Sequence, residues 1–320
     1  RDSWGLRWTN TISYDFNFLP KQHRLNILLG HEVTDSGGSK MSISASHFPS
    51  NFTKDNAFAM INQYDADHGT SKFSSGVDIP GRILSFFGRA NYTLMDRYLF
   101  TVTFRADGSS KFSKKNRYGY FPSGSLAWNF MEEEFMKPLK KVLDAGKLRA
   151  SWGLTGNNRI GEYEYYALLQ ALKSKVGDYI SNGSIPSGVY PINGSTTNVG
   201  TVPTSIGNSN LKWETTEQWN VGLDLSFFKE RLNFTADIYR KTTRDLLLEA
   251  SLPLTSGFYS ATKNIGKVRN DGLELSLNTV NIQTKDFTWS TDFNIAFNKN
   301  EVLALSEGQN SLLTAASFDQ

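Results

Sequence analysis

Side chains that could catalyse a reaction or bind a metal are scattered through this chain. Its four histidines occur in no HExxH or other ligand spacing, and the chain contains no cysteine. There is no GxSxG elbow, SxxK pair or phosphate-binding P-loop, and no two carboxylates stand out as a general acid and base. The sequence therefore predicts no catalytic residue and no cofactor. The four histidines are His23, His31, His47 and His68.

One short segment has partly the form of a calcium-binding loop. Asp65-Ala66-Asp67-His68-Gly69 offers oxygen ligands at alternate positions, as a hard cation requires. The glutamate that closes such a loop at its twelfth position is missing, because Gly76 stands there. We expect a surface turn here and predict no metal.

Tyrosines gather in a Gly-, Ser- and Asn-rich stretch between residues 157 and 210. A tyrosine presents an apolar ring with a polar tip, which suits contact with sugar rings or peptides. The same rings could instead fold the stretch on itself, and for any single tyrosine that reading is favoured. The candidates for substrate contact are Tyr163, Tyr165, Tyr166, Tyr179 and Tyr190.

The composition favours a β protein and excludes several other classes. Aromatic residues reach 13% of the 320 residues, and they suit a pleated sheet. The net charge of +3 is spread along the chain, with one modest basic cluster at Lys111–Arg117, so we predict no nucleic-acid partner. No segment approaches the ~18 to 20 apolar residues of a membrane-spanning helix. A transmembrane β-barrel stays possible, because its strands are apolar on one face only.

Strict alternation of apolar and polar residues is the dominant pattern. From Trp4 to Phe18, apolar side chains share one face, and Arg, Thr, Ser, Asp and Asn share the other. Several such segments match the ~9 to 11 residues that a tilted strand needs to cross a bilayer. The pattern predicts about ten strands, at residues 4–18, 23–34, 83–94, 98–107, 118–130, 147–156, 211–228, 231–244, 272–283 and 287–298.

The connections between these segments alternate between short and long. Short turns fall near Pro20, Asp96, Lys229 and Lys285, and long loops are expected at about 35–82, 157–210 and 250–271. The connector over 131–146 fits this alternation less clearly, because it is long and looks helical. We expect its helix to break at Pro138 and to end at Gly146. In outer-membrane barrels tight turns face the periplasm and long loops face outside. We therefore expect the long loops to be extracellular.

Aromatic residues gather on the apolar face beside the short turns, where a barrel carries an interfacial girdle. The opposite face is polar, as the lumen of a water-filled or plugged channel would be. A soluble β-sandwich would also bury aromatics, but it has no reason to sort its loops by length. The predicted girdle consists of Phe16, Phe18, Tyr92, Tyr98, Phe100, Phe130, Phe227, Phe234, Phe287 and Trp289.

Six sequence blocks are specific as an ordered set. They are FFGRANYTLMDRYLFTVTFRADGSSKF (86–112), YGYFPSGSLAWNF (118–130), KLRASWGLTGNN (147–158), NLKWETTEQWNVGLDLSFFKERL (210–232), DIYRKTTRDLL (237–247) and NIGKVRNDGLELSL (264–277). In this order they resemble the SusC/RagA group of TonB-dependent outer-membrane transporters from Bacteroidetes-type bacteria. The resemblance extends over about two-thirds of the chain, from residue 82 to 299.

The resemblance implies a barrel of about 22 strands closed by a plug domain. It implies TonB-energised uptake of oligosaccharides or peptides, with a SusD-like surface lipoprotein as partner and outer-membrane lipid around the barrel. No residue here matches a plug domain or a TonB-contacting box, and the chain begins within a strand-like pattern. We therefore expect residues 1–320 to be part of the barrel domain, without the plug and the C-terminal strands.

Two other functions stay open at this point. A siderophore or cobalamin receptor of the wider TonB-dependent class would have the same barrel pattern and no SusD-like partner. A secreted β-sandwich that binds carbohydrate or acts as an adhesin would be soluble without detergent.

Overall fold

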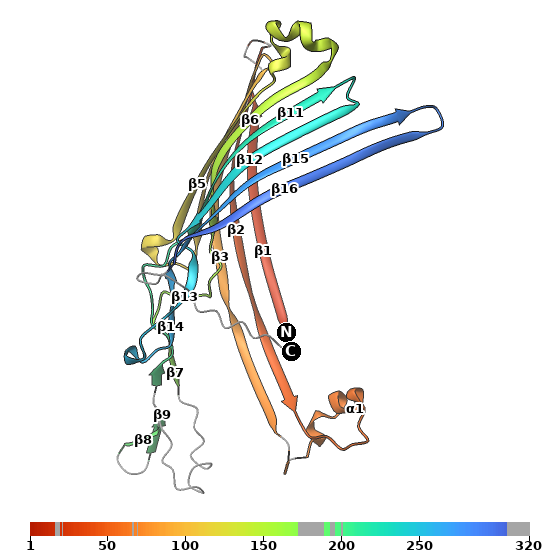
Figure 1. The fold of residues 1–320 in the computed structure, drawn as a ribbon. Helices are drawn as coiled ribbons and strands as arrows, with labels where there is room; N and C mark the ends of the chain where they lie inside the picture. Colours follow the sequence, from red (N-terminus) through yellow and green to blue (C-terminus); the bar gives the residue numbers. More distant parts are fainter. Residues whose placement is uncertain are drawn as a thin grey trace.

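The computed structural model describes residues 1–16, 20, 22–65, 67–68, 70–171, 189–192, 196–199 and 201–305. Ten long strands form one antiparallel sheet, in which each strand pairs with the next long strand along the chain (Figure 1). In order they are β1 (Asp2–Asp15), β2 (His23–Ala45), β3 (Ser71–Leu94), β4 (Tyr98–Ser109), β5 (Tyr118–Trp128), β6 (Leu143–Asn157), β11 (Glu214–Phe227), β12 (Leu232–Arg244), β15 (Lys267–Gln283) and β16 (Thr288–Ala304).

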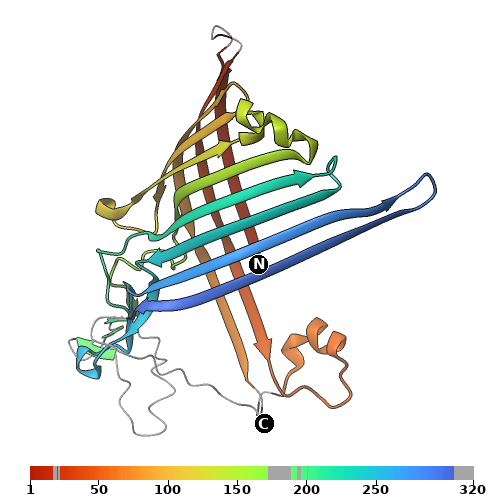
Figure 2. The ribbon, with the colours of Figure 1, turned by 45° about the horizontal axis from the view of Figure 1, so that its top comes forward.

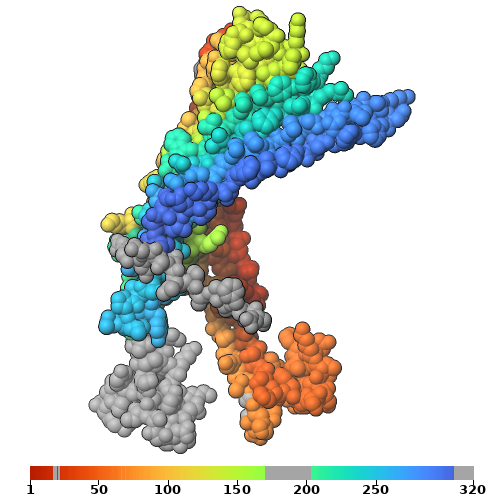
Figure 3. All heavy atoms as spheres, viewed as in Figure 1, coloured from red at the N-terminus to blue at the C-terminus, as the bar shows by residue number. Residues whose placement is uncertain are grey.

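All ten predicted strands are confirmed, but the predicted loop over residues 35–82 is wrong in its bounds. β2 and β3 continue to pair far into that range, as in Ala45 with Ser71, and only residues 46–70 connect them. The register shifts between Ser36 and Gly38, so the Gly-rich segment holds a bulge within the ladder. The β2–β3 hairpin therefore projects beyond the rest of the sheet (orange, Figure 3).

The short and long connections lie at opposite ends of the sheet, which we call the short-turn end and the long-loop end. At the short-turn end, Met95 and Asp96 both have positive φ, 54° and 58°, and the Arg97 N–H donates to the Leu94 carbonyl. This geometry matches the right-handed twist of the flanking strands. The long-loop end carries the connections 46–70, 110–117, 158–213 and 245–266.

The connector before β6 is helical, but it differs from the prediction. It forms two 3₁₀ helices, η3 (Phe130–Glu132) and η4 (Glu134–Lys141), interrupted at Glu133 and not at Pro138. Glu133 is extended there because Tyr98 Oη and Trp128 Nε1 hold its carboxylate at 2.6 and 3.2 Å. Gly146 lies inside β6, where a Cβ atom would overlap the Phe130 ring.

Short elements complete the described chain, and most of them lie in the connections at the long-loop end. Three small two-stranded sheets are separate from the main sheet: β7 with β10, β8 with β9, and β13 with β14. Their bounds are β7 (Leu169–Ala171), β8 (Val189–Ile192), β9 (Thr196–Val199), β10 (Thr201–Pro203), β13 (Leu247–Ser251) and β14 (Ser260–Asn264). The helices are α1 (Lys54–Ala59), η1 (Ile61–Gln63), η2 (Lys114–Asn116) and η5 (Leu254–Ser256).

The sheet is strongly curved (Figures 1 and 2). The side chains on its apolar face are exposed. Ile12, Val102 and Ile238 on that face are 71%, 62% and 63% exposed. Within the described ranges only five hydrophobic side chains are buried, and Phe121 is the one among them that lies in a strand of the sheet: Phe112, Phe121, Met131, Leu211 and Trp213. No helix in these ranges is long and apolar enough to span a membrane. An apolar surface this large must be covered by something outside the chain.

Candidate functional site

A small aromatic core anchors the connections at the long-loop end. The Trp213 ring lies 5.4 Å from the Phe112 ring and 5.5 Å from the Phe121 ring, measured between centroids. Leu211 completes the cluster, and both Phe112 and Leu211 are fully buried. The Trp213 indole also donates to the Arg117 carbonyl at 2.9 Å. Three of the quoted sequence blocks, ending SSKF, beginning YGYF and beginning NLKW, therefore meet in one place.

The two ends of the 158–213 connection run side by side and form a stem, which we define as residues 160–171 and 201–211. The Thr204 N–H donates to the Leu168 carbonyl at 2.8 Å, and the short strands β7 and β10 pair beyond it. Gly207 permits the closest approach, because a Cβ atom there would overlap the backbone of Tyr166 and Ala167. The stem is thus fixed at its base by backbone contacts.

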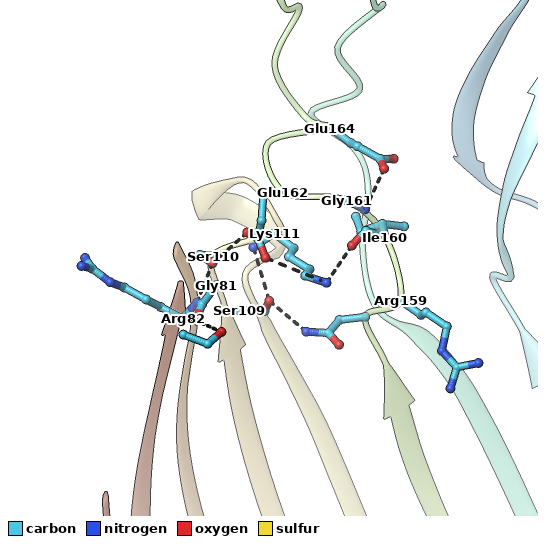
Figure 4. A network of polar contacts seen from close by, with 12 residues as sticks. Gly81, Arg82, Ser109, Ser110, Lys111, Arg159, Ile160, Gly161, Glu162 and Glu164 are labelled. Carbon is cyan, nitrogen blue, oxygen red and sulfur yellow. Dashed lines mark hydrogen bonds and ion pairs between the residues drawn. The ribbon is translucent and has the colours of Figure 1, made fainter. Parts of the chain in front are cut away.

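A polar latch ties the stem to the 110–117 connection (Figure 4). The Lys111 ammonium donates to the Ile160 carbonyl at 2.7 Å and lies 3.9 Å from the Glu162 carboxylate. The Ser110 hydroxyl donates to Glu162 at 3.1 Å. The Glu162 and Lys111 side chains are only 16% and 26% exposed, so these charges are partly desolvated.

The β13–β14 hairpin secures the other side of the stem. The Asn208 side chain donates to the Thr262 carbonyl at 3.0 Å. The Asn264 amide accepts from the Lys212 N–H at 2.9 Å and donates to the Lys212 carbonyl at 2.8 Å. Connections that are distant in the sequence therefore form one fixed platform at this end of the sheet.

Three of the predicted tyrosines lie together on this platform. Tyr165 and Tyr166 have ring centroids 4.3 Å apart, and the Tyr163 ring lies about 6 Å from both. Tyr163 has φ of 61°, a left-handed backbone conformation unusual outside glycine. The Tyr166 ring is 56% exposed, whereas burial and the neighbouring Tyr166 raise the pKa of the Tyr165 hydroxyl. The cluster thus has an inner and an outer ring.

The other two tyrosine candidates and the aspartate-rich segment from the sequence are not part of the described cluster. Tyr179 lies outside the described residues, and Tyr190 lies in β8, where its side chain is not described. The Asp65 carboxylate accepts the Asp67 N–H at 2.9 Å and pairs with the His68 ring at 2.7 Å, so it closes a local turn. His68 lowers the pKa of that carboxyl.

The polar face of the sheet carries networks of charged side chains. Arg149 on β6 donates two hydrogen bonds to Asp224 on β11, at 2.7 and 2.9 Å, and a third to Asp237 on β12 at 3.1 Å. Gly222 leaves room for this guanidinium, since a Cβ atom there would meet it. These contacts link three strands across a polar surface.

A second network lies nearer to β1, around Arg105. Its guanidinium contacts Asp107 at 2.8 Å, Ser85 at 3.0 Å and Glu32 at 3.6 Å. Arg7 lies 3.3 Å from the other side of Glu32. In a closed barrel such a face is a polar interior.

The latch carries a pH-dependent prediction. Burial raises the pKa of the Glu162 carboxyl, against the opposing effects of Lys111 and Ser110. The Glu162 carboxyl therefore binds its proton more tightly when the stem is docked than when the stem is released. Docking is firmest below the ordinary carboxyl pKa and weakens as the pH rises through the raised value.

Hydrogen exchange of the stem amides, corrected for its intrinsic pH dependence, should thus show protection falling from about pH 4 upward. Glu162→Gln should keep the protection and lose that dependence. An identical pH profile in both proteins would contradict the assignment.

Nearly the whole chain matches a known barrel family, and relatives of the chain come from Bacteroidetes. The family model "TonB dependent receptor-like, beta-barrel" matches residues 1–316. TonB-dependent receptor P3 of Formosa agariphila is 42% identical over 234 residues, which cover 73% of this chain and 22% of that receptor. TonB-dependent receptor SusC of Bacteroides thetaiotaomicron is 42% identical over 230 residues, 72% of this chain and 22% of SusC. The chain therefore spans about a fifth of the length of these two relatives.

Solved structures show the same fold. The RagAB peptide transporter has a TM-score of 0.79 at 28% identity, covering 98% of this chain and 32% of that one. The outer membrane transporter YddB from Escherichia coli has a TM-score of 0.58 at 12% identity, covering 92% and 33%, a likeness of fold alone. The single curved sheet with an exposed apolar face is thus a segment of a transmembrane barrel and not a β-sandwich. The chain belongs to the TonB-dependent receptor-like β-barrel family and lies in the outer membrane of a Bacteroidetes-type bacterium.

Proposed function

We propose that the complete protein imports oligosaccharides or peptides across the outer membrane, energised by TonB through a plug domain. The observation that carries the proposal is the likeness to the RagAB peptide transporter along 98% of the chain at 28% identity. The 42% identity to SusC supports the same class. We propose no enzymatic step.

We also propose an orientation for the barrel. The long-loop end, with the stem and its tyrosines, faces the outside of the cell, and the short-turn end faces the periplasm. The sorting of connections by length supports this, because outer-membrane barrels keep their short turns in the periplasm. The connections 46–70 and 158–213 are then extracellular loops, as the sequence predicts.

A SusD-like lipoprotein is the proposed partner at the extracellular mouth. The likeness to SusC and to the RagAB structures supports this partnership. The platform offers a fixed surface on which such a partner can rest, since the stem is held by the latch on one side and the β13–β14 hairpin on the other. Co-purification of the lipoprotein with the tagged full-length receptor tests it.

Uptake by the intact operon tests the function itself. A strain deleted for the receptor should lose growth or uptake on one class among defined peptides and oligosaccharides, and the complete gene should restore it. Loss of uptake of a ferric siderophore or cobalamin, with glycans and peptides unaffected, would favour the other TonB-dependent class.

We further propose that the outer ring of the tyrosine cluster contacts the ligand. Tyr166→Ala should raise the half-saturating ligand concentration about 2- to 10-fold, because an aromatic contact contributes ~0.5 to 1.5 kcal/mol. Tyr166→Phe keeps the ring and should change it less. Equal uptake by wild type and Tyr166→Ala, with the receptor present at normal amount in the outer membrane, would exclude the contact.

A further inference from the structure

An elongated groove of about 760 Å³ runs over the apolar face of β11, β12, β15 and β16. The part nearer the short-turn end is apolar, lined by Val221, Ile238, Leu273 and Phe297. The part nearer the long-loop end is charged, lined by Arg240, Asp271 and Lys299. The groove is therefore amphipathic along its length.

The change from apolar to charged marks one edge of the hydrocarbon layer. On β16 the outward residues Phe293 and Phe297 are apolar and Lys299 follows them, while on β12 Ile238 is followed by Arg240. From Trp289 to Phe297, eight steps of ~3.4 Å span roughly 27 Å. A tilt of ~35–45° reduces this to about 20 Å of height, close to the ~25 Å apolar band of such barrels.

Two tryptophans give independent evidence for the position of this edge of the hydrocarbon layer. The Trp152 and Trp219 rings lie 5.9 Å apart, and both indoles donate to Glu217, at 2.9 and 3.2 Å. Tryptophans with one polar contact are typical of the membrane–water boundary. Trp219 lines the groove, so the groove passes through that boundary.

The charged rim carries an excess of cations. Arg240 pairs with Asp271 at 2.7 Å, and Arg269 bridges Asp271 at 3.1 Å and Glu301 at 2.7 Å. The Lys299 side chain is 77% exposed, with its nearest carboxylate oxygen, on Glu301, at 3.8 Å. The outward-facing charged residues of the rim on these four strands are five cations and three anions. The cations are Arg240, Arg244, Lys267, Arg269 and Lys299, and the anions are Glu217, Asp271 and Glu301.

We propose that this groove binds a membrane lipid with an anionic phosphate headgroup, its acyl chain on Val221, Ile238, Leu273 and Phe297 and its phosphate on Lys299 and Arg240. Charge complementarity selects the headgroup, because the rim is positive and exposed cations at a membrane surface attract phosphate. A second groove, of about 570 Å³ over β2–β4, has the outward residues Ile27, Leu29, Phe86, Val102 and Phe104 and no outward cation. Only the first groove can therefore select a lipid by charge.

Native mass spectrometry of the full-length receptor in detergent tests the proposal. Dioleoyl phosphatidylglycerol and dioleoyl phosphatidylcholine are the two probes, since they share acyl chains and differ in net charge. The wild-type protein should retain phosphatidylglycerol in preference. Lys299→Glu should reduce that retention about fivefold or more, and the neutral variant Lys299→Gln should reduce it less.

Asn298→Glu is the matched control. It introduces the same carboxylate one residue away, on the opposite face of β16, and should leave lipid retention unchanged. Its change in net charge equals that of Lys299→Gln, so the comparison of these two variants separates position from charge. Equal retention of both lipids by the wild type, or equal loss in the Lys299→Glu and Asn298→Glu proteins, would overturn the proposal. So would a receptor dimer that Lys299→Glu dissociates without changing lipid retention, because a second copy would then cover this face. All variants must show the heat-modifiable gel shift of a folded barrel.

Discussion

Arginine at Val102 is expected to destabilise the folded barrel by about 2–4 kcal/mol. Val102 lies mid-strand on the apolar face of β4 and is 62% exposed, between Ala90 on β3 and Gly124 on β5. Neither neighbour has a side chain that could pair with a guanidinium. The charge would therefore lie in hydrocarbon, far from the interface to which long side chains can reach.

The neighbouring Thr101 provides the matched control. Its side chain is on the opposite face, where its hydroxyl donates to Asn91 at 3.0 Å. Thr101→Arg loses that bond but places its charge in the polar interior, so it should cost much less. Denaturant titration of the full-length receptor in lipid vesicles measures both values. Equal destabilisation by the two variants would mean that the lipid-facing side of β4 is assigned wrongly.

Removing the Phe112 ring should release the platform at the long-loop end. Phe112 is fully buried against Trp213, and Phe→Ala changes in a packed core cost ~3–5 kcal/mol. Within the cluster only Phe121 belongs to the main sheet, and Phe112, Leu211 and Trp213 lie in its connections, so the loss is expected in local docking of the 110–117 and 158–213 connections. The membrane-spanning strands should stay folded.

Limited proteolysis and hydrogen exchange of the full-length receptor can follow that release. In Phe112→Ala, cleavage within the stem and exchange at Leu211 should increase strongly, with the heat-modifiable gel shift unchanged. Phe58→Ala is the control, because that ring on α1 is 85% exposed and its loss should change neither readout. Unaltered protection of the stem in Phe112→Ala would show that the latch and the hairpin hold the platform without the aromatic core.

The spanning strands were predictable because lipid and lumen impose a period of two on every one of them. β4, for example, runs from Tyr98 to Ser109 where alternation predicts 98–107. The outer halves of β2 and β3 were missed because Gly37, Gly38 and Pro80 are typical of loops. Ser36 pairs with Gly81 and the next pair is Gly38 with Asp78, so the pairing is irregular between them. Pro80 lies in this irregular segment and needs no ladder partner.

The candidate site was only partly predictable. Tyr163, Tyr165 and Tyr166 are close in sequence, and their clustering follows from that. Lys111 and Glu162 lie 51 positions apart and are ordinary polar residues in loops, so nothing local indicates their contact. The buried core had a visible signal in the quoted blocks around Phe112 and Trp213, although only the fold shows that the blocks meet.

Because of the stem, the structural constraints on the barrel do not extend to the middle of its longest connection, 158–213. Its two sides are held by the latch, the aromatic core and the β13–β14 hairpin, all fastened to residues near the sheet. The chain between Ala171 and Thr201 can therefore vary in length and composition while its insertion points stay fixed. A segment replaced between these two points would leave the contacts of the membrane-embedded scaffold unchanged, so the scaffold would need no redesign.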